Sequence, residues 1–212
     1  MSIRYAFHLD LKNCTGCKAC QIACKEKNKL PTGLLWRRVV EVCGGSWTAR
    51  GQAWLDDTFT YFLSTSCYHC EDPICLEVCP TRAITQQDNG IVTVETDRCI
   101  GCHYCEWACP YGAPRFDPVT GLMSKCDFCI DLLEQGRPPA CVAACQMRVL
   151  DFGDLTELKD KFGSDDPMSA FFPLPQPGLT HPAATFKLHA DVRTGESKDA
   201  SIANEEEIQR EN

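Results

Sequence analysis

The sequence predicts an α+β protein with two similar halves, a β-rich insertion and an extended C-terminal tail. Three observations lead to this prediction. Sixteen of the 17 cysteines fall into four groups of four, two of these groups repeat one motif, and short β-prone runs lie between groups. A repeated motif indicates a structural module that occurs more than once, so we expect the two halves to be related by pseudo-symmetry.

The four cysteine groups follow one another along the chain, and Pro80 and Pro110 come directly after the second and third groups. The first and third groups, CTGCKACQIAC and CIGCHYCEWAC, share every cysteine position, a glycine before the second cysteine and an alanine before the last. The groups are Cys14, Cys17, Cys20 and Cys24; Cys67, Cys70, Cys75 and Cys79; Cys99, Cys102, Cys105 and Cys109; and Cys126, Cys129, Cys141 and Cys145.

Two segments outside the cysteine groups have the pattern of β-strands. AITQQDNGIVTVE, between groups two and three, has two β-prone runs around an Asp-Asn-Gly turn and predicts a hairpin. In residues 31–66, the runs WRRVVEV and FTYFLST are separated by Gly44, Gly45 and Gly51. This stretch therefore predicts a β-rich insertion.

The C-terminal part begins with the pattern of a short helix. Asp154 and Glu157 are a capping pair, Gly163 is a stop signal, and apolar residues recur on one face between them. These apolar residues are Leu155, Leu158 and Phe162. The remaining tail is proline-rich and then polar, so it is expected to have no core of its own. An extended strap on a neighbouring chain and a partly disordered tail both fit this composition.

Cysteines make up about 8% of the chain, so disulfides, zinc sites and iron–sulfur clusters are all candidates. The first residues, MSIRYAFHLDLKNC, lack the apolar run of a secretion signal, which weighs against disulfides. Zinc sites usually take two separated pairs of ligands. Groups one and three instead have C-x2-C-x2-C and a fourth cysteine after three further residues, the run with which bacterial ferredoxins bind [4Fe–4S] clusters. Sixteen such cysteines predict four [4Fe–4S] clusters.

The fourth cysteine of such a run points toward a second cluster, so ligands are expected to cross between paired groups. Groups two and three are joined by only residues 80–98 and should pair, which leaves groups one and four as the other pair. The four clusters would then form a row. The predicted ligands are set A, Cys14, Cys17, Cys20 and Cys145; set B, Cys24, Cys126, Cys129 and Cys141; set C, Cys67, Cys70, Cys75 and Cys109; and set D, Cys79, Cys99, Cys102 and Cys105.

The predicted domains follow from this pairing. One bacterial-ferredoxin-like half comprises residues 1–30 and 120–163 and carries groups one and four. The other half comprises residues 67–119 and carries groups two and three. Residues 31–66 are the β-rich insertion, and residues 164–212 are an extended docking tail.

Several other residues lie beside the cysteines. We expect Tyr104 and Trp107 to pack against a cluster and keep water away from it. His69 and His103 are expected to be hydrogen-bond donors near a cluster or docking-surface residues, and Cys43 a free, partly buried thiol. Four basic residues fit either of two roles, raising cluster potentials or remaining solvated charges: Lys18, Arg98, Lys125 and Arg148.

With these motifs placed, the chain resembles the four-cluster iron–sulfur subunits of membrane-linked molybdopterin oxidoreductases. Within that family it is most similar to the branch of the electron-transfer subunits of anaerobic dimethyl sulfoxide reductase. The resemblance implies the ligand pairing given above. Some relatives have Trp at the position of Cys102 and hold a three-iron cluster there, so the cysteine in this chain implies four [4Fe–4S] clusters. This chain departs from close relatives at Gln146, where they often have proline. The matching segments, about three quarters of the chain, are YAFHLDLKNCTGCKACQIACK, WRRVVEVCGGSW, CYHCEDPICLEVCPTRAI, CIGCHYCEWACPYGAPRF, MSKCDFC and VLDFGDL.

The resemblance implies an electron-transfer subunit with no catalytic site of its own. It would pass electrons between an integral membrane anchor that oxidises quinol and a molybdopterin-containing catalytic subunit, in a heterotrimer that reduces dimethyl sulfoxide or a related S- or N-oxide. The expectation of a subunit without its own catalytic site agrees with the sequence, which has no phosphate-binding loop, nucleophile elbow or HExxH motif. The alternatives are a free-standing polyferredoxin, a structural zinc module, and the same subunit type in a formate, thiosulfate, polysulfide or selenate enzyme.

Charge and hydropathy limit the partners and the location. A net charge of −8 and a pI near 5.1 argue against binding to nucleic acid. No apolar stretch reaches the roughly 18 residues of a membrane span. The chain is therefore expected to be peripheral to the cytoplasmic membrane through its partners, either in the cytoplasm or in the periplasm after co-export with a twin-arginine partner.

Overall fold

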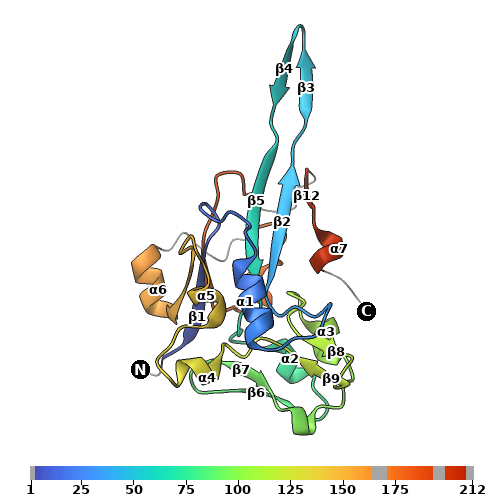
Figure 1. The fold of residues 1–212 in the computed structure, drawn as a ribbon, viewed down its shortest axis with the longest axis vertical. Coiled ribbons are helices and arrows are strands. Elements are labelled where there is room, and N and C mark those ends of the chain that lie inside the picture. Colours follow the sequence, from blue (N-terminus) through green and yellow to red (C-terminus); the bar gives the residue numbers. More distant parts are fainter. Residues whose placement is uncertain (1–2, 164–170, 193–198, 209–212) are drawn as a thin grey trace.

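The computed structural model describes residues 3–163, 171–192 and 199–208. Short helices alternate with small β-sheets, which confirms the predicted α+β class (Figure 1). The strands are β1 (Tyr5–Asp10), β2 (Arg38–Gly44), β3 (Trp47–Arg50), β4 (Ala53–Asp56), β5 (Phe59–Thr65), β6 (Ile84–Gln86), β7 (Val92–Val94), β8 (Arg115–Asp117), β9 (Leu122–Ser124), β10 (Leu150–Asp154), β11 (Ala184–Lys187) and β12 (Ala200–Ile202). The helices are α1 (Ala19–Lys27), α2 (Ile74–Glu77), α3 (Tyr104–Ala108), α4 (Ile130–Leu133), α5 (Ala140–Ala143), α6 (Leu155–Phe162) and α7 (Glu205–Ile208), with short turns η1 (Thr96–Arg98) and η2 (Pro177–Leu179).

Strand β1 is the centre of a three-stranded sheet. It pairs antiparallel with β10 and parallel with β11, and four consecutive residues of β1 are buried because both faces of the strand are covered. Helix α6 packs on this sheet through Leu158, which contacts Ala6 and Ala183. The Asp154 carboxylate accepts hydrogen bonds from the first turn of α6, and Gly163 follows its last residue, so the predicted helix is confirmed.

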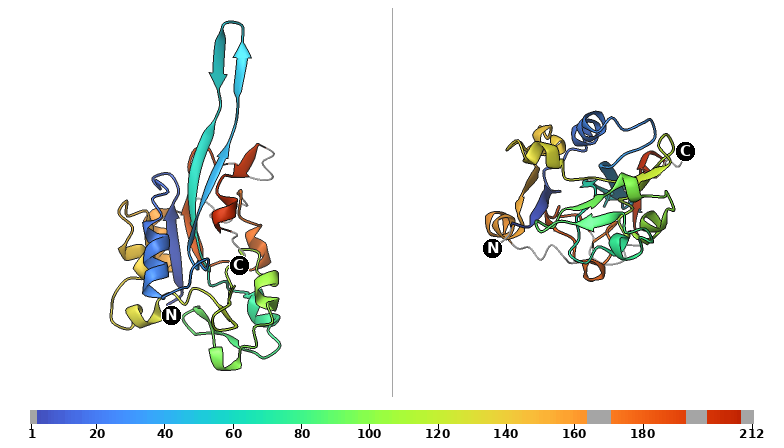
Figure 2. Two further views of the ribbon diagram at one scale, coloured as in Figure 1. Left: turned by 45° about the vertical axis from the view of Figure 1, so that its right-hand side comes forward. Right: turned by 90° about the horizontal axis from the view of Figure 1, so that it is seen from below.

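Strands β2 and β5 form the predicted β-rich insertion, paired antiparallel from Arg38 with Thr65 to Gly44 with Phe59. Beyond them the chain continues into the β3–β4 hairpin, which projects from the body in both figures (Figures 1 and 2). Every residue of β3 and β4 is exposed, and neither strand has the apolar alternation that signals a buried face. The sequence pattern therefore did not predict this hairpin.

Two short hairpins enclose a second, smaller core. Strands β6 and β7 form the hairpin predicted between groups two and three, and β8 and β9 form another. Ile84, Val92 and Met123 from these strands pack around Cys75 and Cys105. The cysteines are thus part of the packing itself.

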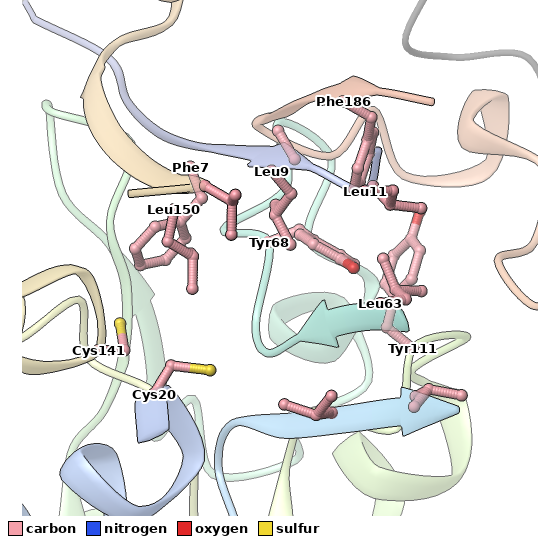
Figure 3. Close-up of a cluster of buried hydrophobic side chains, with 14 of the residues drawn as sticks. Phe7, Leu9, Leu11, Cys20, Leu63, Tyr68, Tyr111, Cys141, Leu150 and Phe186 are labelled. Atoms are coloured by element: carbon pink, nitrogen blue, oxygen red, sulfur yellow. The ribbon is translucent and has the colours of Figure 1, made fainter. Parts of the chain in front are cut away.

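The main core is built around β1, β5 and the C-terminal residues, and it also contains cysteines (Figure 3). Figure 3 shows Cys20 and Cys141 near Phe7 and Leu150. Phe186 on β11 is 4% exposed and belongs to the same core. The described part of the tail therefore completes the sheets of its own chain.

Two predictions about organisation stay predictions. The residues 164–170, 193–198 and 209–212 of the expected docking tail lie outside the described residues. The division into two ferredoxin-like halves is not decided by the sheet topology, because strands from several predicted segments share sheets. No helix in the described part of the chain is long and apolar enough to cross a membrane.

Candidate iron–sulfur sites

The repeated motif of groups one and three also has a repeated backbone conformation. Gly16 and Lys18 before α1 have φ of 66° and 59°, and Gly101 and His103 before α3 both have φ of 65°. Left-handed residues that alternate with other conformations turn successive backbone N–H groups toward one side, and such concave nests hold anions, including iron–sulfur groups. Glycine is required at 101 for a second reason, because a Cβ there would lie 2.3 Å from the carbonyl oxygen of Gly121.

The cysteines of set A line one cavity. Cys14, Cys17 and Cys20 reach it from the first loop and α1, and Cys145 reaches it from the loop after α5. The cavity is partly open to solvent. Its other walls are largely apolar, formed by residues such as Leu9, Val39 and Phe62.

The cysteines of sets C and D line two further cavities. In the set C cavity, Cys109 of group three stands with three cysteines of group two. In the set D cavity, Cys79 of group two stands with three cysteines of group three. The fourth cysteine of each group thus faces the cavity of the other group.

The cysteines of set B lie together where α1 packs against α5. Burial raises the pKa of the Cys24 thiol to about 12, with further increases from the charges of Cys141 and Cys129. Burial also raises the pKa of Cys126, and the charges of Cys24 and Cys141 act in the same direction. These interactions place Cys24 near Cys126, Cys129 and Cys141.

Interactions between cysteines of different sets indicate which sets lie next to one another. Cys141 of set B raises the pKa of Cys20 of set A, secondary to burial. Cys67 of set C likewise acts on Cys126 of set B. Cys75 of set C shares the smaller core with three cysteines of set D. Set A is thus coupled to set B, set B to set C, and set C shares a core with set D, which agrees with the predicted row.

Hydrogen bonds to sulfur are typical around iron–sulfur sites, because they stabilise anionic sulfur. Backbone N–H groups donate to Cys67 from His69 (3.4 Å), to Cys79 from Ala83 (3.2 Å), to Cys99 from Met123 (3.4 Å) and to Cys109 from Ala113 (3.5 Å). At Cys79, burial acts to raise the pKa, but hydrogen bonds outweigh it and the pKa is lowered. The backbone thus prepares this sulfur for the thiolate form.

The four basic residues named from the sequence have different environments. Lys125 is 4% exposed, and its ammonium group donates to the Cys67 sulfur at 3.6 Å. Lys18 is half-buried, lines the set A cavity and pairs with Glu41 and Glu207. Arg98 is exposed and pairs with Glu95, and exposed Arg148 bonds only a backbone carbonyl among the described residues. Of these four, Lys125 is the one that donates to a cysteine sulfur.

A fifth basic residue, Arg37, was missed by the sequence analysis. It is 1% exposed and interacts electrostatically with cysteines of sets A and B. The available signal was the pair Arg37-Arg38 at the start of the apolar run VVEV. Arginines beside a run of buried strand residues need polar or charged partners, so this pair pointed to such groups nearby.

The aromatic and histidine predictions have mixed outcomes. Tyr104 and Trp107 are 51% and 73% exposed, so the expectation that they pack over a cluster is wrong. They lie on the outer face of α3, whereas Cys105 faces inward. His69 is fully buried and accepts a hydrogen bond from Val92, while His103 pairs with Glu106.

The residues fit [4Fe–4S] groups better than the other candidates. All 17 cysteines, which lie within the described ranges, are free of disulfides, and Cys43 is partly buried as predicted. In those ranges no three His, Cys, Asp or Glu side chains converge on a point that would hold one metal ion. The thiols of sets A, C and D instead line three cavities, each with the four cysteines of one set. Soft thiolate donors in fours are the usual ligands of iron–sulfur clusters.

Comparisons with known proteins agree with this chemistry. A family model described as "4Fe-4S dicluster domain" matches residues 58–155. The B chain of anaerobic dimethyl sulfoxide reductase from Escherichia coli is 42% identical over 208 residues, which cover 98% of this chain and 100% of the relative. The B chain of polysulfide reductase from Wolinella succinogenes is 40% identical over 76% of this chain and 82% of its own length. The thiosulfate reductase electron transfer subunit PhsB of Salmonella typhi is 43% identical over 73% of this chain and 78% of its own length.

These relatives are named as B chains or electron-transfer subunits of oxidoreductases. The identity to the first relative extends over nearly the whole chain, including all four cysteine groups. This chain therefore belongs to the family of [4Fe–4S] electron-transfer subunits of oxidoreductase complexes that includes the B chain of anaerobic dimethyl sulfoxide reductase.

Proposed function

We propose that this chain conducts electrons through four [4Fe–4S] clusters, one held by each of sets A to D. The observation that carries the proposal is the crossing of ligands, in which the last cysteine of one group lines the cavity of its partner group. In this proposal, residues 1–30 with 120–163 and residues 67–119 are the two ferredoxin-like halves.

When bound, a [4Fe–4S] group takes up and releases one electron at a time. The chain's own residues hold it through cysteine thiolates, donate backbone N–H groups to the sulfurs and exclude water by burying most of the thiols. The order A, B, C and D gives the electrons a path from one end of the cysteine row to the other.

The partners proposed for this chain are a molybdopterin-containing catalytic subunit and an integral membrane subunit that oxidises quinol, together a heterotrimer. The reaction served is the reduction of dimethyl sulfoxide or a related S- or N-oxide, as in the relative with 42% identity over its full length. Exposed apolar side chains support the existence of partners, because monomeric proteins rarely expose such clusters. They are Trp47, Trp54 and Leu55 on the hairpin and Ile100, Tyr104 and Trp107 beside set D.

The experiment that tests this function is anaerobic purification from the native source, followed by measurement of iron, zinc and molybdenum. We expect about 16 irons per chain beyond those of the catalytic subunit, about one molybdenum and no stoichiometric zinc. Full iron content without molybdenum or a large partner would instead support a free-standing polyferredoxin. Location on the periplasmic or cytoplasmic side of the cytoplasmic membrane would be read from protease access in intact cells and spheroplasts.

A second experiment tests the ligand sets through additivity of iron loss. Cys109→Ser and Cys70→Ser belong to the same set, so their combination should lose about 4 irons, as each single variant does. Cys109→Ser with Cys102→Ser affects two sets and should lose about 8. If ligands did not cross, Cys109 would belong with Cys102, and the two double variants would exchange their results.

A further inference from the structure

Arg37 is a buried cation at the contact of two cysteine sets. Its guanidinium donates through Nη1 to the carbonyl oxygen and hydroxyl of Ser64 at 3.2 and 3.1 Å, and its Cζ lies 4.7 Å from the centroid of the Phe7 ring. Its Nη2 is buried and has no hydrogen-bond partner among the described residues. A guanidinium in this state is unfavourable unless negative charge lies nearby.

The described residues provide Arg37 with no carboxylate partner. Its charged neighbours are instead cysteines: Cys20 of set A and Cys24, Cys126 and Cys141 of set B. Burial acts to lower the arginine pKa, but these thiolates outweigh burial and raise it. The counter-charge of Arg37 is therefore the anionic sulfur of two adjacent sets.

Two connections link Arg37 to individual cysteine sulfurs, one through Ser64 and one through its own backbone. The Ser64 hydroxyl accepts from Arg37 and lies 3.3 Å from the Cys20 sulfur, so its own hydrogen is free to point toward set A. The backbone of Arg37 also acts to lower the pKa of the Cys24 thiol of set B. One residue thus acts on set A through its side chain and on set B through both its side chain and its backbone.

We propose that Arg37 sets the reduction potentials of the clusters in sets A and B and raises both. This inference rests on the proposed function, in which these sets hold clusters. Reduction of a cluster adds one electron from its neighbour in the row and no proton, so it increases the negative charge beside Arg37. A fixed cation in a dry site stabilises the reduced form more than the oxidised form.

The test is a redox titration followed by electron paramagnetic resonance on the full-length chain, purified anaerobically, as wild type and Arg37→Gln. We expect the reduction equilibrium constants of sets A and B to fall at least tenfold, which is 59 mV for a one-electron couple, with sets C and D unchanged. The signals are assigned by their loss in Cys17→Ser for set A and Cys129→Ser for set B.

Two further variants keep the test decisive. Arg37→Lys retains the charge and should restore more than half of the lost potential. Arg148→Gln, a matched control, removes an exposed charge three residues from Cys145 and should shift no signal, because water screens it. An equal shift of all four signals in Arg37→Gln, or no shift, would overturn the inference.

Should Arg37→Gln lose iron, Ser64→Ala gives an independent answer with the charge in place. It should lower the potential of set A, to which Ser64 is hydrogen-bonded, and leave sets B, C and D unchanged. No change in set A would reject the side-chain connection. If the wild-type chain itself lacks four titrating signals, the proposed function fails, and this outcome is distinct from a wild type with four signals that Arg37→Gln does not move.

Discussion

Replacement of Lys125 by methionine removes a buried positive charge between sets B and C. The ammonium group donates to the carbonyl oxygens of Val92 and Cys126 and to the Cys67 sulfur. Three acceptors match the three hydrogens of a charged ammonium. Methionine has a similar length and no charge, so it changes the electrostatics of this junction with little change in volume.

The size of the effect follows from the distance of 3.6 Å between Lys125 Nζ and Cys67 Sγ. At an effective dielectric constant of about 20, two unit charges at that separation interact by about 4.6 kcal/mol. An added electron spread evenly over four ligand positions puts about a quarter of its charge there, or about 1.2 kcal/mol. Since about 1.4 kcal/mol corresponds to 59 mV for one electron, we expect the potential of set C to fall by about 50 mV.

The assay is the redox titration described for Arg37, with iron content measured on the same samples. Lys161→Met is the matched control, because it makes the same change at an exposed lysine on α6 that is paired with Asp151. That variant should change no potential beyond the titration error, since exposed charges are screened. A Lys125→Met protein with full iron content and an unchanged set C would refute the reasoning.

Three further predictions concern stability and the remaining thiol. His8 is 2% exposed, and burial lowers its pKa from 6.5 to about 4, so it is neutral in the fold while the unfolded chain gains a proton below about pH 6.5. The free energy of unfolding is therefore highest above pH 6.5 and falls as pH falls toward 4, by about 2 kcal/mol between pH 7 and pH 5. In anaerobic urea unfolding, this free energy should depend less on pH in His8→Gln than in the wild type. An equal dependence in the two proteins would contradict the prediction. Asp154→Ala should cost about 1 kcal/mol in the same assay by removing the cap of α6, whereas Asp154→Asn should retain most of it. Cys43→Ser should leave iron content and all potentials unchanged, and loss of any signal would show that Cys43 is a ligand after all.

The site was more predictable than the surface around it. Spacing along a loop limits which cysteines can meet, so the crossing of Cys109 and Cys79 between neighbouring groups could be predicted from the sequence. Capping chemistry is equally local, which is why Asp154 marked the start of α6. The ligand sets themselves still await the iron measurements proposed above.

Other features depend on contacts that spacing does not encode. Phe186 joins β1 from a tail that has no apolar period of its own, because its partners are more than a hundred residues earlier. Arg37 is buried because two distant cysteine groups surround it. Trp107 was expected to pack against a cluster because it lies inside the third cysteine motif, yet Cys105 occupies the inward face of α3 and Trp107 lies on the outer face.

Each of four short helices holds or precedes two cysteines that belong to two neighbouring sets. Cys20 and Cys24 stand four residues apart on α1, one facing set A and the other set B, and α2, α3 and α5 hold or precede similar pairs. With the proposed ligands, each of these helical turns joins two neighbouring clusters, so backbone hydrogen bonds fix how far apart the two clusters lie. The rate at which an electron passes between them would then be insensitive to movement of the surrounding loops.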